Sequence, residues 1–129
     1  MTRTIKLVKN FRRPWGGYIK FIDNKPCTVK TLYIKKGELL SLQFHKLREE
    51  FWYVVSGKIR ITLGKDSGLL KKRFLGEEEY IKIPRNFLHR IEGIENSKIL
   101  EISTGEFKEN DEIRIEDRYK RKSPKIEIA

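Results

Sequence analysis

Apolar and polar residues alternate along most of this 129-residue chain in short runs that end at Gly, Pro, Asn or Asp. Alternation with a period of two puts apolar side chains on one face of a β-strand, and turn residues between such runs are typical of antiparallel sheets. No helical period is sustained over several turns. The pattern predicts strands at 17–23, 27–35, 39–45, 50–56, 58–63, 69–74, 80–84, 88–92 and 99–104, and a short helical turn near 110–116.

Many short strands joined by regular turns indicate an all-β sandwich or small barrel. The length of 129 residues suits one domain with one core. We expect a single domain in which 1–26 form an N-terminal arm with the first strands and 27–104 form the barrel core. Residues 105–129 form a C-terminal extension, and its tail after residue 120 is expected to be flexible.

The two histidines and one glutamine of the chain fall in a pattern that suits a metal site. Gln43 and His45 are two positions apart in one predicted strand, so their side chains share a face. Glu50 begins the next strand and His89 lies in a later one. Two imidazoles, a carboxylate and an amide oxygen can ligate a divalent transition metal and leave positions open. The alternative is that these are ordinary packed or surface residues, but the flanking Gly and Pro residues favour a metal site.

The same alternation assigns the opposite face of the predicted strand 39–45. If Gln43 and His45 point into a barrel, then Leu40, Leu42 and Phe44 point out of it. An outward apolar stripe needs a cover. We expect that cover to be either the N-terminal segment 11–18 or a second subunit, and therefore predict a homodimer.

Composition limits the partners and the compartment. The net charge is +11, but Lys and Arg are spread along the chain among 18 acids, and no nucleic-acid-binding motif accompanies them. A solvated charged surface is favoured over nucleic-acid binding, and a positive field would attract phosphorylated small molecules.

The single cysteine, Cys27, allows no internal disulfide, which fits a reducing cytosol. No apolar stretch is long enough for a signal peptide or membrane span, so we expect a cytoplasmic protein without a membrane partner.

Five residues resemble the first conserved motif of the cupin superfamily: Gly37, Gln43, His45, Glu50 and Gly57. Gln43 takes the place of the usual first histidine of that motif. The region 76–93, which contains His89, resembles the second cupin motif more loosely. The resemblance implies a cupin jelly-roll β-barrel with a divalent metal inside its mouth, held by Gln43, His45, Glu50 and His89. Zinc suits imidazole and carboxylate ligands, and Mn, Fe, Co and Ni are open alternatives.

A narrower resemblance covers nearly the whole chain. The strings Arg13-Pro14-Trp15-Gly16 and Ser41-Leu42-Gln43, and the C-terminal region 114–121, resemble the C-terminal domain of type II mannose-6-phosphate isomerases. This resemblance implies a stand-alone, metal-dependent aldose–ketose isomerase that interconverts mannose 6-phosphate and fructose 6-phosphate and feeds GDP-mannose and polysaccharide synthesis. The chain departs from the family at Leu47, often a histidine, and at Ser103, often a glutamine, and these departures bear on the exact substrate.

Such an isomerase needs a general base and a group that binds the phosphate. Glu101 lies in the apolar run 99–103, and burial would raise its pKa to a working value if it faces inward. For Glu101 an outward-facing strand residue is an equally good interpretation, and for Lys30, the second candidate, outward exposure is the default. Arg48 lies where it could bind the phosphate or hydrogen-bond to Glu50. Because one fold hosts many functions, the alternative is a non-catalytic cupin that binds a sugar phosphate or a nucleotide sugar.

Overall fold

The structure is a computed structural model that describes residues 7–106 and 108–117. Within this part of the chain the regular elements are strands and two short 3₁₀-helices. The strands are β1 (Val8–Arg13), β2 (Gly16–Lys20), β3 (Cys27–Ile34), β4 (Leu42–Phe44), β5 (Arg48–Ser56), β6 (Lys58–Gly64), β7 (Lys71–Gly76), β8 (Tyr80–Ile83), β9 (Leu88–Gly93), β10 (Ser97–Gly105) and β11 (Ile113–Glu116). The 3₁₀-helices are η1 (Ser67–Leu69) and η2 (Glu109–Asp111).

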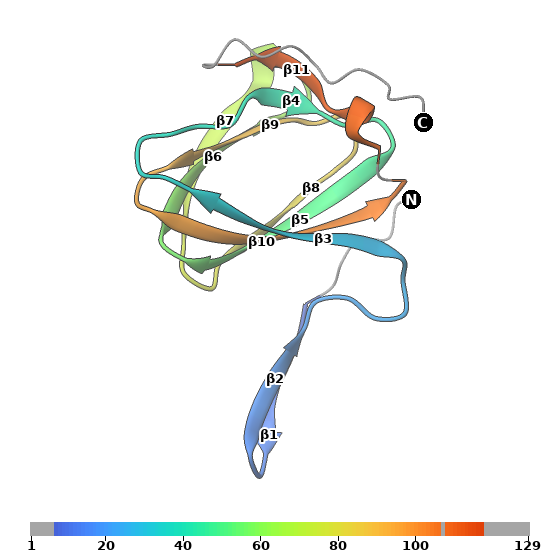
Figure 1. The fold of residues 1–129 in the computed structure, drawn as a ribbon, viewed down its shortest axis with the longest axis vertical. Helices are drawn as coiled ribbons and strands as arrows, with labels where there is room; N and C mark the ends of the chain where they lie inside the picture. Colours follow the sequence, from blue (N-terminus) through green and yellow to red (C-terminus); the bar gives the residue numbers. More distant parts are fainter. Residues whose placement is uncertain (1–6, 107, 118–129) are drawn as a thin grey trace.

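Two antiparallel sheets face each other and enclose the core (Figure 1). One has the strand order β3-β10-β5-β8 and the other has the order β11-β4-β9-β6-β7. Neighbours in each sheet are mostly far apart in sequence, as in a jelly roll. The main core between the sheets consists of apolar residues from their inner faces: Ile34, Trp52, Val54, Ile59, Ile61, Leu75, Ile83, Ile91 and Ile99. The predicted all-β jelly-roll class is confirmed.

The N-terminal arm covers a different face from the predicted one. The β1–β2 hairpin projects away from the barrel (Figure 1), and Trp15 at its tip is 72% exposed. The residues that follow it pack on the outer face of β5 and β10, where the Phe21 ring lies 4.9 Å from the Tyr53 ring. The prediction that segment 11–18 covers the stripe on strand 39–45 is therefore wrong.

The predicted outward stripe is not an open apolar face. Leu42 alternates with Gln43 as expected, but it is only 6% exposed. Leu40 packs against the main core, because β4 begins only at Leu42 and the chain before it does not keep the two-residue period. Leu39 forms a single isolated bridge, with Glu92. The stripe thus gives no reason for a second subunit at this place.

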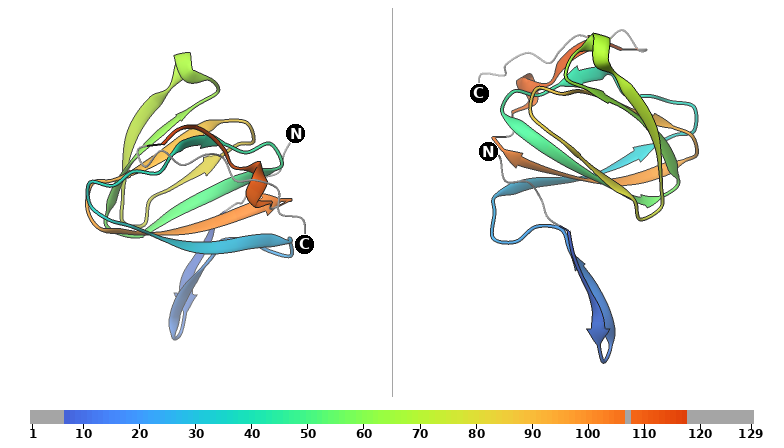
Figure 2. Two further views of the ribbon diagram at one scale, coloured as in Figure 1. Left: turned by 45° about the horizontal axis from the view of Figure 1, so that its top comes forward. Right: turned by 180° about the vertical axis from the view of Figure 1, so that it is seen from behind.

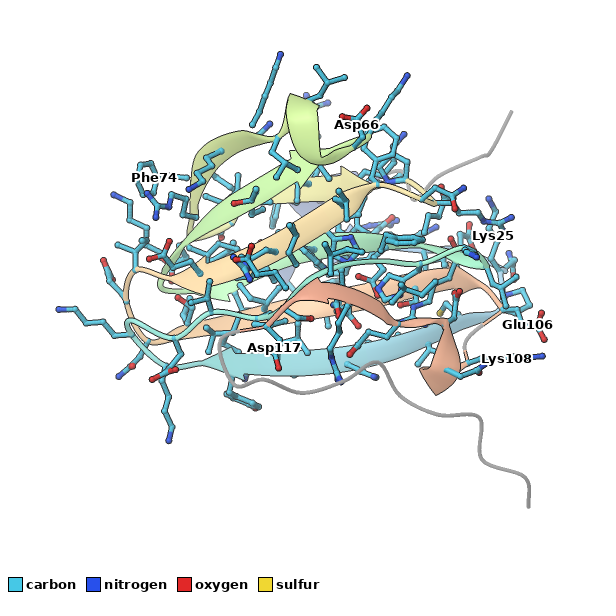
Figure 3. The ribbon with its side chains drawn as sticks, turned by 90° about the horizontal axis from the view of Figure 1, so that it is seen from above. Lys25, Asp66, Phe74, Glu106, Lys108 and Asp117 are labelled. Atoms are coloured by element: carbon cyan, nitrogen blue, oxygen red, sulfur yellow. The ribbon has the colours of Figure 1, made fainter. Side chains whose placement is uncertain are left out.

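The chain after Gly105 contributes to the barrel instead of only extending from it. A helical turn is present as η2, but the prediction of helix as far as residue 116 is wrong, because Ile113–Glu116 form β11. β11 pairs with β4, with Ile113 opposite Phe44 and Arg114 opposite Gln43. Figure 3 shows this edge of the barrel from above, with Asp117 just past the end of β11. The predicted flexible tail after residue 120 lies outside the described residues.

Other differences concern boundaries. β1 is a strand that the alternation did not predict, and β7 begins later than predicted because η1 occupies its expected start. In the part of the chain that the structure describes, no helix is long and apolar enough to span a membrane.

Candidate metal centre

His45, Glu50 and His89 come together inside the barrel from three different segments. The Nε2 atom of His45 lies 3.5 Å from Oε2 of Glu50, and Nε2 of His89 lies 3.7 Å from Oε1. The two imidazole rings are 4.9 Å apart. All three side chains are buried, and one ligand atom from each lies within 4.8 Å of the others. The predicted grouping of these three residues is therefore present.

Hydrogen bonds determine which nitrogen of each imidazole faces the centre. Nδ1 of His45 lies 3.1 Å from the carbonyl oxygen of Asp111, and Nδ1 of His89 lies 2.9 Å from that of Phe87. A carbonyl oxygen can only accept, so each Nδ1 carries the hydrogen and each Nε2 of a neutral ring has a lone pair. Burial lowers the pKa of His45 to about 4 and also lowers the pKa of His89. Both rings are therefore neutral near pH 7.

The resulting atoms fit a metal cation better than they fit one another. Nε2 of His89 is buried and has no hydrogen-bond partner, which is costly for a polar atom. A neutral Nε2 and a carboxylate oxygen are both acceptors, so neither His45 nor His89 can donate to Glu50 through Nε2. Arg48 Nη2 lies 3.4 Å from Nε2 of His45, and Arg48 Nε pairs with Glu50. The unmet lone pair is therefore that of His89 Nε2, which a divalent cation between the three side chains would satisfy.

Gln43 lies beside this group but has another partner. It is buried and stands opposite His89 in the pairing of β4 with β9. Its Oε1 accepts a hydrogen bond from Ser41 Oγ at 2.9 Å. The inward orientation that alternation predicted is thus present, and metal ligation by Gln43 stays a prediction.

Arg48 and Ser103 orient the carboxylate of Glu50. Nε of Arg48 donates to Oε2 of Glu50 at 3.2 Å, and Ser103 Oγ donates to the same oxygen at 3.4 Å. Arg48 is only 4% exposed and also donates to the carbonyl oxygen of Lys108 at 3.2 Å. The expected hydrogen bond from Arg48 to Glu50 is present. The phosphate-binding role of Arg48 stays a prediction.

Glu101 faces inward on β10. It stands between Trp52 on β5 and Lys30 on β3, and Trp52 Nε1 donates to its Oε2 at 3.3 Å. Burial first, and then the charge of Glu50, raise the pKa of Glu101 to about 7. Lys30 is on the same face but exposed, and its charge acts in the opposite direction on this pKa. The catalytic roles of both residues stay predictions.

Two groups near the centre were missed from the sequence. The buried Asp111 carboxylate accepts from the backbone N–H groups of Lys46 and Leu47 at 2.9 and 3.0 Å, which holds the segment that carries His45. No local signal identifies Asp111, because its partners are far away in sequence. Arg114 lies beside Gln43 and forms an ion pair with Glu112. Its strand could have been found from the alternation Ile113-Arg114-Ile115-Glu116.

A jelly-roll barrel with two histidines and a glutamate on its inner side defines the class of the chain, a cupin with a potential metal site. Solved structures agree on the fold. A 3,4-ketoisomerase from Helicobacter canadensis has a TM-score of 0.68 at 18% identity, over 85% of this chain and 87% of that one. Oxalate decarboxylase from Bacillus subtilis has a TM-score of 0.64 at 24% identity, over 70% of this chain and 24% of that one.

Sequence similarity gives the family. Residues 2–117 match the family "Mannose-6-phosphate isomerase C-terminal", and the chain belongs to it. It is 38% identical over 112 residues to mannose-1-phosphate guanylyltransferase ManC of Salmonella typhimurium, covering 84% of this chain and 22% of that protein. It is 36% identical over 115 residues to alginate biosynthesis protein AlgA of Pseudomonas fluorescens, covering 87% of this chain and 23% of that protein. The chain thus spans less than a quarter of the length of these curated relatives.

Proposed function

We propose that the chain is a metal-dependent aldose–ketose isomerase that interconverts mannose 6-phosphate and fructose 6-phosphate. One observation carries the proposal: the neutral imidazoles of His45 and His89 both present Nε2 to the buried carboxylate of Glu50, and a second buried carboxylate lies nearby. This second carboxylate is Glu101, which pairs across the sheet with Trp52, two residues after Glu50 on β5. Family membership supports this sugar. The names of relatives, a mannose-1-phosphate guanylyltransferase and proteins of xanthan and alginate biosynthesis, support a role in GDP-mannose and polysaccharide synthesis.

The residues that would hold the metal are His45, Glu50 and His89, with Gln43 as the fourth ligand. Zinc suits this donor set, and Mn, Fe, Co and Ni are alternatives. When bound, a divalent cation supplies Lewis-acid polarisation of the sugar oxygens at C1 and C2.

Glu101 is the proposed general base. Isomerisation of mannose 6-phosphate removes the proton from C2 and returns one to C1, while a proton passes from the C2 oxygen to the C1 oxygen. A carboxylate with a pKa of about 7 can take up and release the carbon-bound proton near neutral pH. The Trp52 hydrogen bond to Oε2 holds the carboxylate so that Oε1 can face the sugar. Lys30, opposite Glu101 on β3, would stabilise negative charge that develops on the sugar oxygens.

Arg48 is the proposed partner of the substrate phosphate. A guanidinium group suits a phosphate dianion because it presents several N–H donors in one plane. The net charge of +11 would attract the phosphorylated sugar toward the protein.

A non-catalytic binding module is the alternative function. One fold hosts many functions, so a barrel with a buried polar site is compatible with ligand binding without turnover. A protein of this kind would bind a sugar phosphate or a nucleotide sugar without turning it over.

A coupled assay of fructose 6-phosphate formation distinguishes the two functions. We expect turnover of mannose 6-phosphate with added zinc, manganese, iron, cobalt or nickel, and a loss of turnover of at least a hundredfold in Glu101→Gln. The matched control is Glu106→Gln, since Glu106 is an exposed residue just past the end of β10. Binding of the sugar phosphate without turnover across these metals would instead support the binding module.

A further inference from the structure

A pocket of about 450 Å³ lies beside the β6–β7 hairpin, whose end with η1 projects beyond the other strands in the left view of Figure 2. Its floor is apolar and includes Leu63, Ile81 and Phe87. Leu63 is opposite His89 in the pairing of β6 with β9, and Ile81 is opposite Trp52. The pocket therefore adjoins the strands of the metal centre, but none of the candidate metal, base or phosphate residues lines it.

The rim of this pocket is strongly positive. Among its lining residues, all in the described part of the chain, are four basic side chains and no carboxylate: Lys65, Lys71, Lys72 and Arg73. Lys71 and Arg73 occupy inner-face positions of β7, opposite Leu63 and Ile61. The next inner-face residue, Leu75, is buried in the core. The inner face of β7 thus changes from apolar to cationic where the strand passes the pocket.

Inward charges on an edge strand have a known structural use, because they prevent pairing with a second sheet. β7 is an edge strand of its sheet, so this use accounts for one such charge. It does not account for four basic residues around an apolar floor. Lysine and arginine can lay their stems along that floor and keep their charged ends at the rim.

We propose that this pocket binds a phosphorylated ligand that also carries an aromatic ring, as a nucleoside diphosphate does. The ring packs against Leu63, Ile81 and Phe87, and the phosphates contact Lys71 and Arg73. The volume lies within the usual range for small-molecule sites. This ligand and this place differ from the sugar phosphate at the metal centre, so either proposal can fail without the other.

Calorimetric titration of the full chain with adenosine diphosphate, pyrophosphate and adenosine tests the proposal. The protein is first treated with a chelator, so that a metal at His45 and His89 cannot bind the phosphates. We expect adenosine diphosphate to bind more tightly than either fragment, and binding to weaken with added salt. The double variant Lys71→Ala with Arg73→Ala should weaken it at least tenfold.

The matched control removes the same charge elsewhere, with Lys35→Ala and Lys36→Ala on an exposed turn. It should change the dissociation constant less than twofold. Equal losses in both double variants would mean nonspecific charge attraction and would overturn the proposal, as would the absence of binding by the unmodified chain. The proposal would also be overturned if the Lys71 and Arg73 double variant bound adenosine diphosphate with unchanged affinity but self-associated. The two charges would then serve to prevent pairing of β7 with a second sheet.

Discussion

At the scale of single residues, the candidate site depends on how each polar group is held. Alternation fixed the face of each strand residue, and the resemblance to the cupin motifs implied that His45, Glu50 and His89 meet. The same reasoning could not choose the face of Glu101, and it made outward exposure the default for Lys30. Asp111 was out of reach, since its role depends on backbone N–H groups more than sixty positions earlier in the chain.

Glu101 should make the stability of the metal-free protein depend on pH. Burial raises its pKa from 4.5 to about 7, so its favourable contribution is complete below pH 4.5 and is lost as the pH rises through 7. Glu101→Gln removes this loss. We expect the variant to gain roughly 2–3 kcal/mol in free energy of unfolding, relative to the unmodified chain, between pH 4.5 and pH 8.

Urea denaturation of both proteins across this pH range measures the effect. The histidines titrate in both proteins, so their contribution cancels in the difference. A difference in unfolding free energy that stays constant from pH 4.5 to pH 8 would contradict burial of an ionisable Glu101.

At the scale of elements, most barrel strands were predicted near their observed bounds, including the edge strands β3 and β8, whereas β1 and β11 were not predicted. β1 lies in a hairpin outside the barrel, where few positions must be apolar, and the alternation of β11 is only four residues long. β4 is shorter than predicted because the chain around Leu40 packs on the core outside regular pairing. Long-range pairing, which the sequence does not display, decided these cases.

Arg90 should hold β11 onto the barrel. Its guanidinium donates to the carboxylate and carbonyl oxygens of Glu116 at 2.8 and 3.1 Å, and to the carbonyl oxygen of Leu40 at 2.9 Å. We expect Arg90→Ala to lower the free energy of unfolding by about 1–2 kcal/mol. Amide exchange in β11 should become faster, while that in β5 stays slow.

Lys36→Ala is the control for Arg90→Ala, because Lys36 is an exposed residue of a turn. Unchanged exchange rates in β11 of the Arg90 variant would show that the pairing with β4 holds this strand by itself.

At the scale of the whole molecule, the β1–β2 hairpin is the feature that the barrel does not explain. It projects from the body (Figure 2), and Phe11 and Trp15 are 62% and 72% exposed. An isolated two-stranded hairpin is marginally stable in water, and exposed aromatic residues on it suit a protein contact. The predicted homodimer therefore has a better basis in this hairpin than in the stripe on β4.

We expect a dimer by light scattering at micromolar concentration, and a monomer after Phe11→Ser with Trp15→Ser. The control Leu69→Ser replaces an equally exposed apolar residue elsewhere and should leave the dimer intact. A monomeric unmodified chain would contradict the predicted homodimer.

The most direct test of the account is the metal content of the purified chain and its variants, measured by elemental analysis after loading with zinc. One ion per chain is expected, with stoichiometric binding lost in both His45→Ala and His89→Ala while the circular dichroism of the barrel is kept. Gln43→Ala should weaken binding less, because an amide oxygen is a poorer donor than imidazole for such metals. Full metal content in both histidine variants would contradict the account, because the ion would then be bound elsewhere.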